Sequence, residues 1–414
     1  MLDDESFIVS SKRAPADFTR SRVLTFRTVA VLLMAKGSRS LQLALNEFIP
    51  KLGASVPTVS KVAYSKARRK LKHTAFITLN QEAVVRTMYE DGDYQTLHGF
   101  RILAVDGSTV MLPDNYETRK EFGSVRYRNQ KPDVAGEHCY GLVSVLYDVL
   151  NRIAINAQLA PIRTSETELA EQQMQHTTKN DLVIYDRGYC SFRLLAAASK
   201  ADGQFLVRCK RGSFRIATDM LDGKGSDDVV LELVSRTDSA QMLTVRFVRV
   251  MLDTGEYEVL TTSLTNQQQY PVTIFKDLYY CRWGIETFYG VLKTRLNLEN
   301  FSGYSPEAAL QDFHAAVFLT GAETILTEDT EESLKQQHGG HPKKVNKAVS
   351  FNAIKYRAFE LFYSKEPEEQ VLKELEQLFK QSPTQVRKDK KPPRKQSATR
   401  QVLGFWKRQR KMVF

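Results

Sequence analysis

The sequence has few of the residues that build cross-linked or zinc-stabilised scaffolds. Its four cysteines include no C-x-x-C pair, so the pattern indicates neither a disulfide framework nor a zinc ribbon. The apolar run at residues 28–35 is too short to cross a bilayer. Asp3, Asp4 and Glu5 stand where a signal peptide would have bases. We therefore expect a reduced protein of the cytoplasm that has no membrane partner.

Net charge is concentrated at one end of the chain. The 414 residues include 59 Lys and Arg against 48 Asp and Glu, a formal charge of +11. Residues 387–414 hold eleven of the bases and one acid, so this tail carries +10 and the rest of the chain +1. Hydrophobic residues make up 42% of the chain, which excludes wholesale disorder. A basic tail of this kind indicates an anionic partner.

Hydrophobic periodicity divides the chain into a helical start, a strand-rich middle and a helical end. Residues 1–95 have helical periodicity, and residues 96–300 alternate strands with helices around a β-rich insertion at about 212–266. Residues 301–386 are again helical and precede the basic tail. This order predicts an α/β protein: a mixed sheet with helices on both faces, an inserted β-rich subdomain and flanking all-helical regions. The C-terminal helices are a candidate dimerisation region.

Local signals predict where some of these elements begin and end. Thr58 is a predicted N-cap, and Ser165 with Glu168 three residues on has the spacing of a capping box. The polar stretch at residues 327–347 is predicted to be a loop.

The predicted helix over residues 58–72 is strongly basic. It contains no acid, and three of its bases (Lys61, Arg68 and Lys72) lie at i, i+7 and i+11 on one face, with Arg69 beside them. Such a face is either solvated surface or a surface that docks on DNA, and the sequence leaves both interpretations open.

Two short apolar strands each end in an acid. Asp106 follows residues 102–105, and Asp186 follows residues 182–185. Ligands gather at strand ends in open α/β sheets, so an acid there is placed for chemistry. Each acid also has an ordinary explanation, because Asp106 precedes Gly107 in a common turn dipeptide and Asp186 can cap a helix.

A helix predicted over about residues 272–298 carries four reactive side chains on one side. Tyr279, Arg282, Glu286 and Lys293 lie at i, i+3, i+7 and i+14. At about 100° per residue they fall within an arc of roughly 60°. An apolar stripe adjoins them, formed by Leu278, Ile285, Phe288, Leu292 and Leu296. Glu286 and Lys293 are too far apart for an i,i+4 ion pair, although a solvated face remains the alternative.

The two strand acids and the glutamate of the predicted helix together suit the binding of metal ions. Asp106, Asp186 and Glu286 would repel one another if they converged, so convergence implies bound cations. Hard oxygen ligands without a His or Cys cluster favour Mg²⁺ or Mn²⁺. Two such ions about 3.5–4 Å apart stabilise the attacking and leaving oxygens of an in-line phosphoryl transfer. Arg282 and Lys293 would then hold phosphates nearby.

At this point the chain resembles a known family. The spacing Y-(2)-R-(3)-E-(6)-K from Tyr279 to Lys293, with Trp283 after the arginine, resembles the Y-R-E-K signature of bacterial insertion-sequence DDE transposases. These enzymes belong to the RNase H-like, retroviral-integrase superfamily. The segments V-D-G-S-T around Asp106 and Y-D-R-G-Y around Asp186 are similar to the family's first two acidic strands. The resemblance covers about residues 101–303.

The resemblance implies an enzyme that binds transposon ends and catalyses DNA cleavage followed by strand transfer. Asp106, Asp186 and Glu286 would hold two Mg²⁺ or Mn²⁺ ions per active site. Contacts to DNA near the transposon end are implied for Tyr279, Arg282, Trp283 and Lys293. The implied partners are the terminal inverted repeats, the target DNA and a second copy of the chain in a synaptic homodimer.

Two other functions remain open. The first is a metal-dependent nuclease that cuts DNA without joining it, and the second is an inactive, transposase-derived DNA-binding protein. The β-rich insertion contains no tryptophan, the residue with which related enzymes stack on a flipped base during hairpin formation. The aromatic residues of the insertion that are candidates for this stacking role are Phe214, Phe247 and Tyr257.

We predict that the tail contributes to DNA binding through phosphate neutralisation. If the tail and the helix over residues 58–72 together neutralise about eight phosphates, log K falls against log salt with a slope of roughly −7. Deleting residues 387–414 should flatten that slope, measured by fluorescence anisotropy over a salt series. An unchanged slope would remove the tail from the binding surface.

Overall fold

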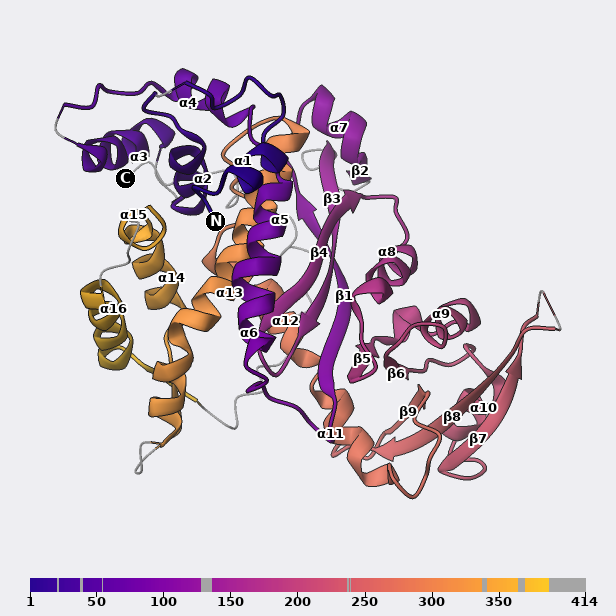
Figure 1. Ribbon diagram of the computed structural model, residues 1–414. Coiled ribbons are helices and arrows are strands. Elements are labelled where there is room, and N and C mark those ends of the chain that lie inside the picture. The colour runs from indigo at the N-terminus through magenta and orange to yellow at the C-terminus, as the bar shows by residue number, and fades with distance from the viewer. Residues whose placement is uncertain are drawn as a thin grey trace. The chain divides into compact units, whose positions relative to one another are not determined.

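The computed structural model describes most of the chain, namely residues 1–20, 22–37, 40–53, 55–127, 136–236, 238, 240–336, 341–363 and 369–386. The chain divides into two compact units, whose elements are labelled in Figure 1. Unit 1 comprises Met1–Thr87, Val110–Gly141 and the chain from Gly290, and unit 2 comprises Met88–Thr109 and Leu142–Tyr289. The basic tail lies outside the described residues.

Among the described residues, nine strands form one mixed sheet in the order β2-β3-β1-β5-β6-β9-β8-β7, with β4 paired to β3. β1, β5 and β6 are parallel neighbours, whereas β6, β9, β8 and β7 pair antiparallel. The strands are β1 (Arg101–Met111), β2 (Ser124–Tyr127), β3 (Gly136–Asp148), β4 (Ile153–Pro161), β5 (Asp181–Tyr185), β6 (Gln204–Arg208), β7 (Asp228–Val234), β8 (Met242–Met251) and β9 (Tyr257–Thr262). This mixed sheet with its helices confirms the predicted α/β class.

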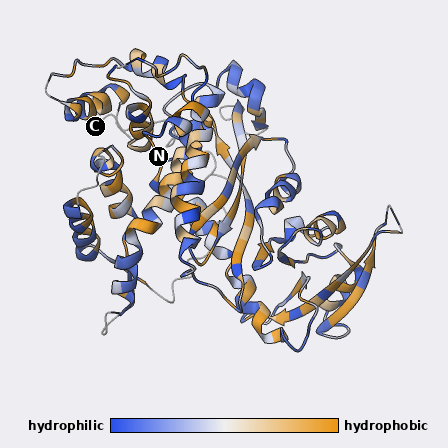
Figure 2. Cartoon of the chain, in the orientation of Figure 1, coloured by the Kyte–Doolittle hydropathy of each residue, from blue (hydrophilic) through white to orange (hydrophobic). Residues whose placement is uncertain are grey.

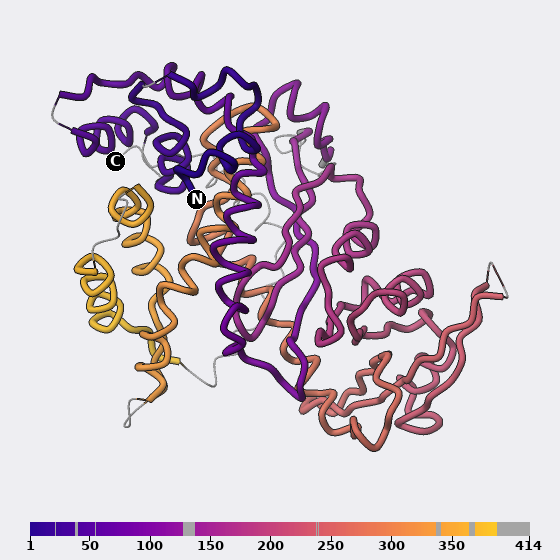
Figure 3. Tube along the Cα trace, in the orientation of Figure 1, coloured from indigo at the N-terminus to yellow at the C-terminus, as the bar shows by residue number. Residues whose placement is uncertain are grey.

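The predicted β-rich insertion consists of strands β7 to β9 and a helix, α10 (Arg215–Leu221), that the sequence pattern did not predict. Figure 3 shows β7 and β8 as a long hairpin with α10 beside it. Because β9 pairs with β6, these strands extend the main sheet. Phe247 is fully buried, and its ring centroid lies 5.7 Å from that of the partly buried Phe214, so the two rings pack against each other.

The other helices of unit 2 follow the predicted segments closely. They are α8 (Glu166–Gln173) with a 3₁₀ turn (Met174–His176), a 3₁₀ turn (Arg187–Tyr189), α9 (Phe192–Ala198), a 3₁₀ turn (Val272–Ile274), α11 (Phe275–Tyr280) and α12 (Trp283–Gly290). Ser165 occupies the N-cap position of α8, but its side chain makes no capping hydrogen bond, so the predicted capping box does not form.

The helix predicted over residues 272–298 is not continuous. It is interrupted at Cys281 and Arg282, between α11 and α12, and a π-helical turn (Val291–Arg295) follows α12. The predicted arc of roughly 60° assumed 100° per residue without a break, so that part of the prediction is wrong. The apolar stripe is confirmed, because Leu278, Ile285, Phe288, Leu292 and Leu296 are all buried.

A buried cluster holds α11 on the sheet. Phe275, Leu278 and Tyr279 of the helix pack with strand residues that include Ile102, Leu182, Ile184, Leu206 and Leu260. The apolar residues of the short parallel strands thus meet the apolar side of the helix that ends beside Arg282.

Unit 1 is built around one long helix, α13 (Pro306–Gln336). Its other helical elements are α1 (Glu5–Ser11), α2 (Phe26–Met34), α3 (Leu41–Phe48), a 3₁₀ turn (Ile49–Leu52), α4 (Lys61–Arg68), α5 (Thr74–Asn80), a π-helical turn (Gln81–Val85), α7 (Tyr116–Phe122), α14 (Lys347–Tyr356), α15 (Ala358–Phe362) and α16 (Glu369–Gln381). A short helix, α6 (Arg86–Glu90), joins the two units, and β10 (Lys343–Lys344) pairs with β11 (Thr384–Gln385).

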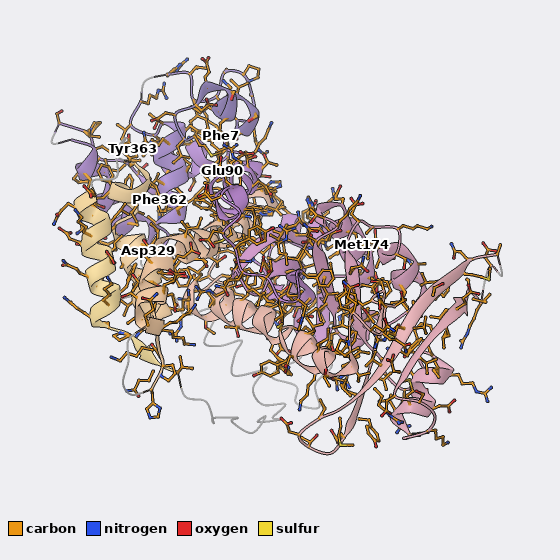
Figure 4. All side chains as sticks on the ribbon, turned by 60° about the horizontal axis from the view of Figure 1, so that its bottom comes forward. Phe7, Glu90, Met174, Asp329, Phe362 and Tyr363 are labelled. Carbon is orange, nitrogen blue, oxygen red and sulfur yellow. The ribbon has the colours of Figure 1, made fainter. Side chains whose placement is uncertain are left out.

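N-terminal and C-terminal helices pack together in unit 1. Figure 1 shows α5 alongside α13, and Gly321 of α13 lies so close to Val84 that an added Cβ would fall 2.3 Å from a Val84 methyl. Phe362 and Tyr363, labelled in Figure 4, make ring contacts with Phe318 of α13 and Phe48 of α3 respectively. Helix α16 is largely hydrophilic in Figure 2, and its buried residues are Val371, Leu375 and Phe379.

Two predicted helix ends are wrong in this unit. Helix α4 begins at Lys61, with the Ser60 hydroxyl accepting a hydrogen bond from the Ala63 amide, so Ser60 and not Thr58 is the N-cap. Helix α13 continues to Gln336 through the first part of the predicted loop, because Thr327, Thr330, Glu331 and Leu334 are buried.

Arg68, predicted to face DNA, is buried in unit 1 with 5% of its surface exposed. Its guanidinium donates to Asp312 at 2.9 Å, Gln311 at 2.7 Å, Ser302 at 2.7 Å and the Ala308 carbonyl at 2.7 Å. Burial alone would raise the pKa of Asp312, but the charges of Arg68 and Lys36 hold it below its usual value. Arg68 is therefore a structural residue, and the DNA contact predicted for it is wrong.

We predict that Arg68→Ala lowers the free energy of unfolding by about 3–5 kcal/mol, because it leaves the Asp312 carboxylate buried without its main partner. Urea denaturation at pH 7 measures this change, and Lys61→Ala on the exposed surface of the same helix is the control. If Arg68→Ala instead left the unfolding free energy unchanged and weakened only DNA binding, the structural assignment would be wrong.

Candidate active site

Two of the predicted acids lie side by side, Asp106 within β1 and Asp186 just after the neighbouring parallel strand β5. The register of β1 and β5 pairs Val105 with Tyr185, and Asp106 and Asp186 are the next residue on each strand. Asp186 also stands before the 3₁₀ turn Arg187–Tyr189, but its side chain makes no capping hydrogen bond. Helix capping therefore does not account for Asp186. Asp106 lies inside β1, which continues to Met111, so the prediction that its strand ends at this acid is wrong. The parallel register nevertheless places the two acids on neighbouring strands.

One buried guanidinium connects the third acid to the first. Arg282, in the break between α11 and α12, is 4% exposed. Its Nη2 donates to Oε1 of Glu286 at 2.9 Å, and its Nη1 lies 3.9 Å from Oδ2 of Asp106. Asp186 also acts on Arg282 electrostatically. The three predicted acids are thus gathered around a single positive charge.

Two tyrosines and one backbone amide fix the positions of the acids. The Tyr279 hydroxyl donates to Oδ1 of Asp186 at 3.3 Å, and the Tyr289 hydroxyl donates to the Asp106 carbonyl oxygen at 2.7 Å. The Gly107 amide donates to Oδ1 of Asp106 at 2.9 Å. Tyr279 is 3% exposed, so its contacts in this structure are to the site itself.

The environment of Asp106 disfavours its charged form. Burial raises the pKa of Asp106 to about 6, against the opposing effects of the Gly107 amide and Arg282, and the charges of Asp186 and Glu166 add to the increase. A carboxyl group with such a pKa gains strongly from a nearby cation.

Three further residues join the site without having been predicted. Glu166, in the first turn of α8, lies against Gly107. The Tyr189 hydroxyl is buried and is affected by the charges of Glu166, Asp106 and Asp186. Glu258 of β9 forms an ion pair with Arg208 at 2.8 Å and is affected by the charge of Asp186. Glu166 and Glu168 have the same sequence signature of a helix start, so no local pattern separates them. Only Tyr189 had a signal, since it closes the segment Asp186-Arg-Gly-Tyr.

The other residues predicted to contact DNA differ in their exposure and in the unit in which they lie. Trp283 is 44% exposed, and its ring centroid lies 5.0 Å from the Arg282 guanidinium. Lys293 lies in the π-helical turn Val291–Arg295, in unit 1. Lys61 and Arg69 are exposed in unit 1, and Lys72 there donates to the Ser10 carbonyl oxygen at 3.0 Å. The DNA contacts of these residues stay predictions.

The donor set suits a hard divalent cation. The acids of the site supply carboxylate oxygens and no His or Cys, and carboxylate oxygen is the ligand type that Mg²⁺ and Mn²⁺ prefer. As the side chains stand, no group of three or more His, Cys, Asp or Glu residues in the described ranges encloses a metal position. Arg282 supplies the positive charge, and its buried Nε has no hydrogen-bond partner among the described residues.

A family model matches the part of the chain that contains the three acids. Residues 97–320 match the family model described as the transposase DDE domain, and this stretch is more than half of the chain and contains all three predicted acids. The chain belongs to the transposase DDE domain family. The part of the prediction that named a DDE transposase domain is thereby confirmed.

Two bacterial proteins with transposase names are similar to the chain. It is 28% identical over 204 residues to transposase InsG for insertion sequence element IS4 of Escherichia coli (strain K12), which is 47% of this chain and 44% of that protein. It is 28% identical over 142 residues to putative transposase y4zB of Sinorhizobium fredii (strain NBRC 101917 / NGR234), 32% of this chain and 39% of that protein. The matched segment thus spans less than half the length of each relative.

A solved structure of another transposase is also similar. The match to the piggyBac transposase, solved in a synaptic complex with hairpin DNA, covers 94% of this chain and 81% of the piggyBac chain, with a TM-score of 0.42 and 11% identity.

In the part of the chain that the structure describes, no helix is long and apolar enough to span a membrane.

We predict that Asp106→Asn stabilises the metal-free protein above pH 6. The raised pKa means that Asp106 favours folding while it is protonated, below about pH 4, and loses that contribution as the pH rises through about 6. The asparagine has no charge to bury, so its advantage should grow from near zero at pH 4 to on the order of 1–3 kcal/mol at pH 7. Thermal unfolding in EDTA across this range measures the difference, and a pH-independent difference would contradict the assignment.

Proposed function

We propose that this chain is a DNA transposase of the bacterial insertion-sequence group with the Y-R-E-K signature. It binds transposon ends and catalyses metal-dependent DNA cleavage and strand transfer. The observation that carries the proposal is the arrangement of the acids: Asp106 and Asp186 lie next to each other on paired parallel strands, and Arg282 links Glu286 to Asp106. Membership in the transposase DDE domain family supports the same reaction class.

Asp106, Asp186 and Glu286 would hold two Mg²⁺ or Mn²⁺ ions. When bound, such ions stabilise the attacking and leaving oxygens of an in-line displacement at phosphorus. First water and then the freed 3′-hydroxyl attacks a phosphodiester, which gives hydrolysis followed by joining. Tyr279 and Tyr289 keep the first two acids in place through their hydrogen bonds to Asp186 and to the Asp106 backbone.

Arg282 has two roles in this proposal. Without cations, its guanidinium neutralises the converging carboxylates. Its unpaired Nε is a donor for a DNA phosphate, since a buried N–H without an acceptor is costly and an anionic oxygen satisfies it. Trp283, exposed beside it, offers a ring for contact with DNA.

The DNA partners proposed are the terminal inverted repeats and the target DNA, bound in the cytoplasm by a synaptic homodimer. Lys293 completes the proposed contacts near the transposon end, whereas Tyr279, predicted to join it, is buried and bonds to Asp186 instead. Among the bases of the predicted N-terminal face, Lys61, Arg69 and Lys72 are retained as phosphate contacts, and Arg68 is not, because it is buried.

We expect Asp106→Asn, Asp186→Asn and Glu286→Gln each to reduce joining by at least about 100-fold, since each removes a ligand that the metal needs. The assay supplies precut terminal repeats, a target plasmid and Mg²⁺, and scores joined products on a gel. Asp202→Asn, an exposed acid of unit 2, is the matched control and should join at the wild-type rate.

The same assay separates the proposal from its rivals. Cutting of uncut ends without any joining would indicate a metal-dependent nuclease, and binding without either reaction would indicate an inactive DNA-binding protein. Full strand transfer by all three acid variants would show that the mechanism proposed here is wrong.

A further inference from the structure

A fourth carboxyl group lies beside the first acid of the site. Gly107 follows Asp106 on β1, and a Cβ added at Gly107 would fall 2.7 Å from both Cδ and Oε1 of Glu166. The Glu166 carboxyl group therefore occupies the space that a side chain at position 107 would take. Its contact with the strand is direct, and it is made at the residue next to Asp106.

The charge of Glu166 acts on the acids of the site. Glu166 is exposed as a residue, but desolvation of its carboxyl group and then the charge of Asp186 raise its pKa, and Glu166 in turn contributes to the raised pKa of Asp106. Among the described residues Glu166 has no ion-pair partner. A carboxylate placed near two others without a base of its own is electrostatically unfavourable, unless a cation joins them.

An independent observation points to a missing ligand at the same place. The Tyr189 side chain is 2% exposed, and its hydroxyl has no hydrogen-bond partner among the described residues. Burial and the nearby charges, first of Glu166 and then of Asp106, raise its pKa. Buried hydroxyl groups are ordinarily paired, and an orphan one is a sign of a water or ion at that position. The unpartnered Tyr189 hydroxyl thus lies within electrostatic reach of Glu166 and Asp106.

We propose that Glu166 supplies a fourth carboxylate to this site and binds a divalent cation together with Asp106 and Asp186, an inference that rests on the proposed function. The carboxylate oxygens form a hard donor set, and the hydrated cation gives the Tyr189 hydroxyl the oxygen partner that it lacks. The acidic signature of the site is therefore four carboxylates from β1, the end of β5, α8 and α12.

The ordinary explanation of Glu166 is favourable interaction with the N-terminus of α8. Glu168 shares that explanation, because it lies in the same first turn, and it is exposed as well. Glu166 differs from Glu168 in its contact with Gly107 and in its electrostatic coupling to Asp106 and Asp186. Glu168→Gln is therefore a matched control that removes the same charge from the same helix turn.

The test is Mn²⁺ binding by the full-length, metal-free protein, followed by the electron paramagnetic resonance signal of free Mn²⁺. Glu166→Gln should weaken Mn²⁺ binding by about tenfold or more, whereas Glu168→Gln should change it by less than about twofold. Glu166→Asp, which keeps the charge but withdraws the carboxylate, should also weaken binding. Wild-type affinity in Glu166→Gln or in Glu166→Asp would overturn ligation by Glu166.

Asp106→Asn and Asp186→Asn, measured in parallel, distinguish failure of this inference from failure of the proposed function. If these two variants lose Mn²⁺ binding and Glu166→Gln does not, the inference fails and the proposed metal site stands. If the wild type does not bind Mn²⁺, or if the Asp106 and Asp186 variants bind it normally, the proposed metal site fails and the inference fails with it.

Gly107→Ala tests the contact without removing a charge. The backbone of Gly107 is outside the left-handed region, so alanine is tolerated there, and its Cβ displaces the flexible end of Glu166. We expect Gly107→Ala to weaken Mn²⁺ binding and to add little to the effect of Glu166→Gln in the double variant. Fully additive effects would contradict the contact on which the proposal depends.

Discussion

Repulsion between carboxylates is the constraint on which the organisation of unit 2 depends. Asp106, Asp186 and Glu286 come from two strands and a helix, and a single buried guanidinium, that of Arg282, holds them together. The break between α11 and α12 is what places Arg282 there, since a residue in the middle of a continuous helix would have a different direction. The interruption of the helix is therefore part of the site.

The supporting residues act on the acids through short, specific contacts. Tyr279 bonds to Asp186 and is itself anchored in the cluster that packs α11 on the sheet. Tyr289 reaches the Asp106 backbone from the end of α12. The two halves of the broken helix are thus tied to two different acids, α11 to Asp186 and α12 to Asp106. A site of this kind is held by packing and hydrogen bonds together, which is how reactive groups keep their positions.

The sequence was informative where chemistry follows local pattern. Apolar runs ending in an acid identified Asp106 and Asp186, and their adjacency follows from the parallel pairing of the two strands. The break at Cys281 could not be predicted, because Leu278 and Ile285 keep the apolar periodicity on both sides of it.

Long-range contacts explain the remaining errors. Arg68 has the spacing of a DNA-facing base, but its partner Asp312 is 244 residues away in the chain. Glu166 and Glu168 are equivalent as helix-start residues, and only the approach of Gly107 tells them apart.

At the opposite ends of β1 and β5, Arg101 and the fully buried Asp181 form a two-pronged ion pair at 2.6 and 2.7 Å, at the first position of the shared register. A slip of one residue between these strands would break that pair, turn Asp186 to the other face of the sheet and separate it from Asp106. The alignment of the proposed metal ligands is thus enforced by an ion pair that takes no part in the chemistry and lies a full strand length away from it.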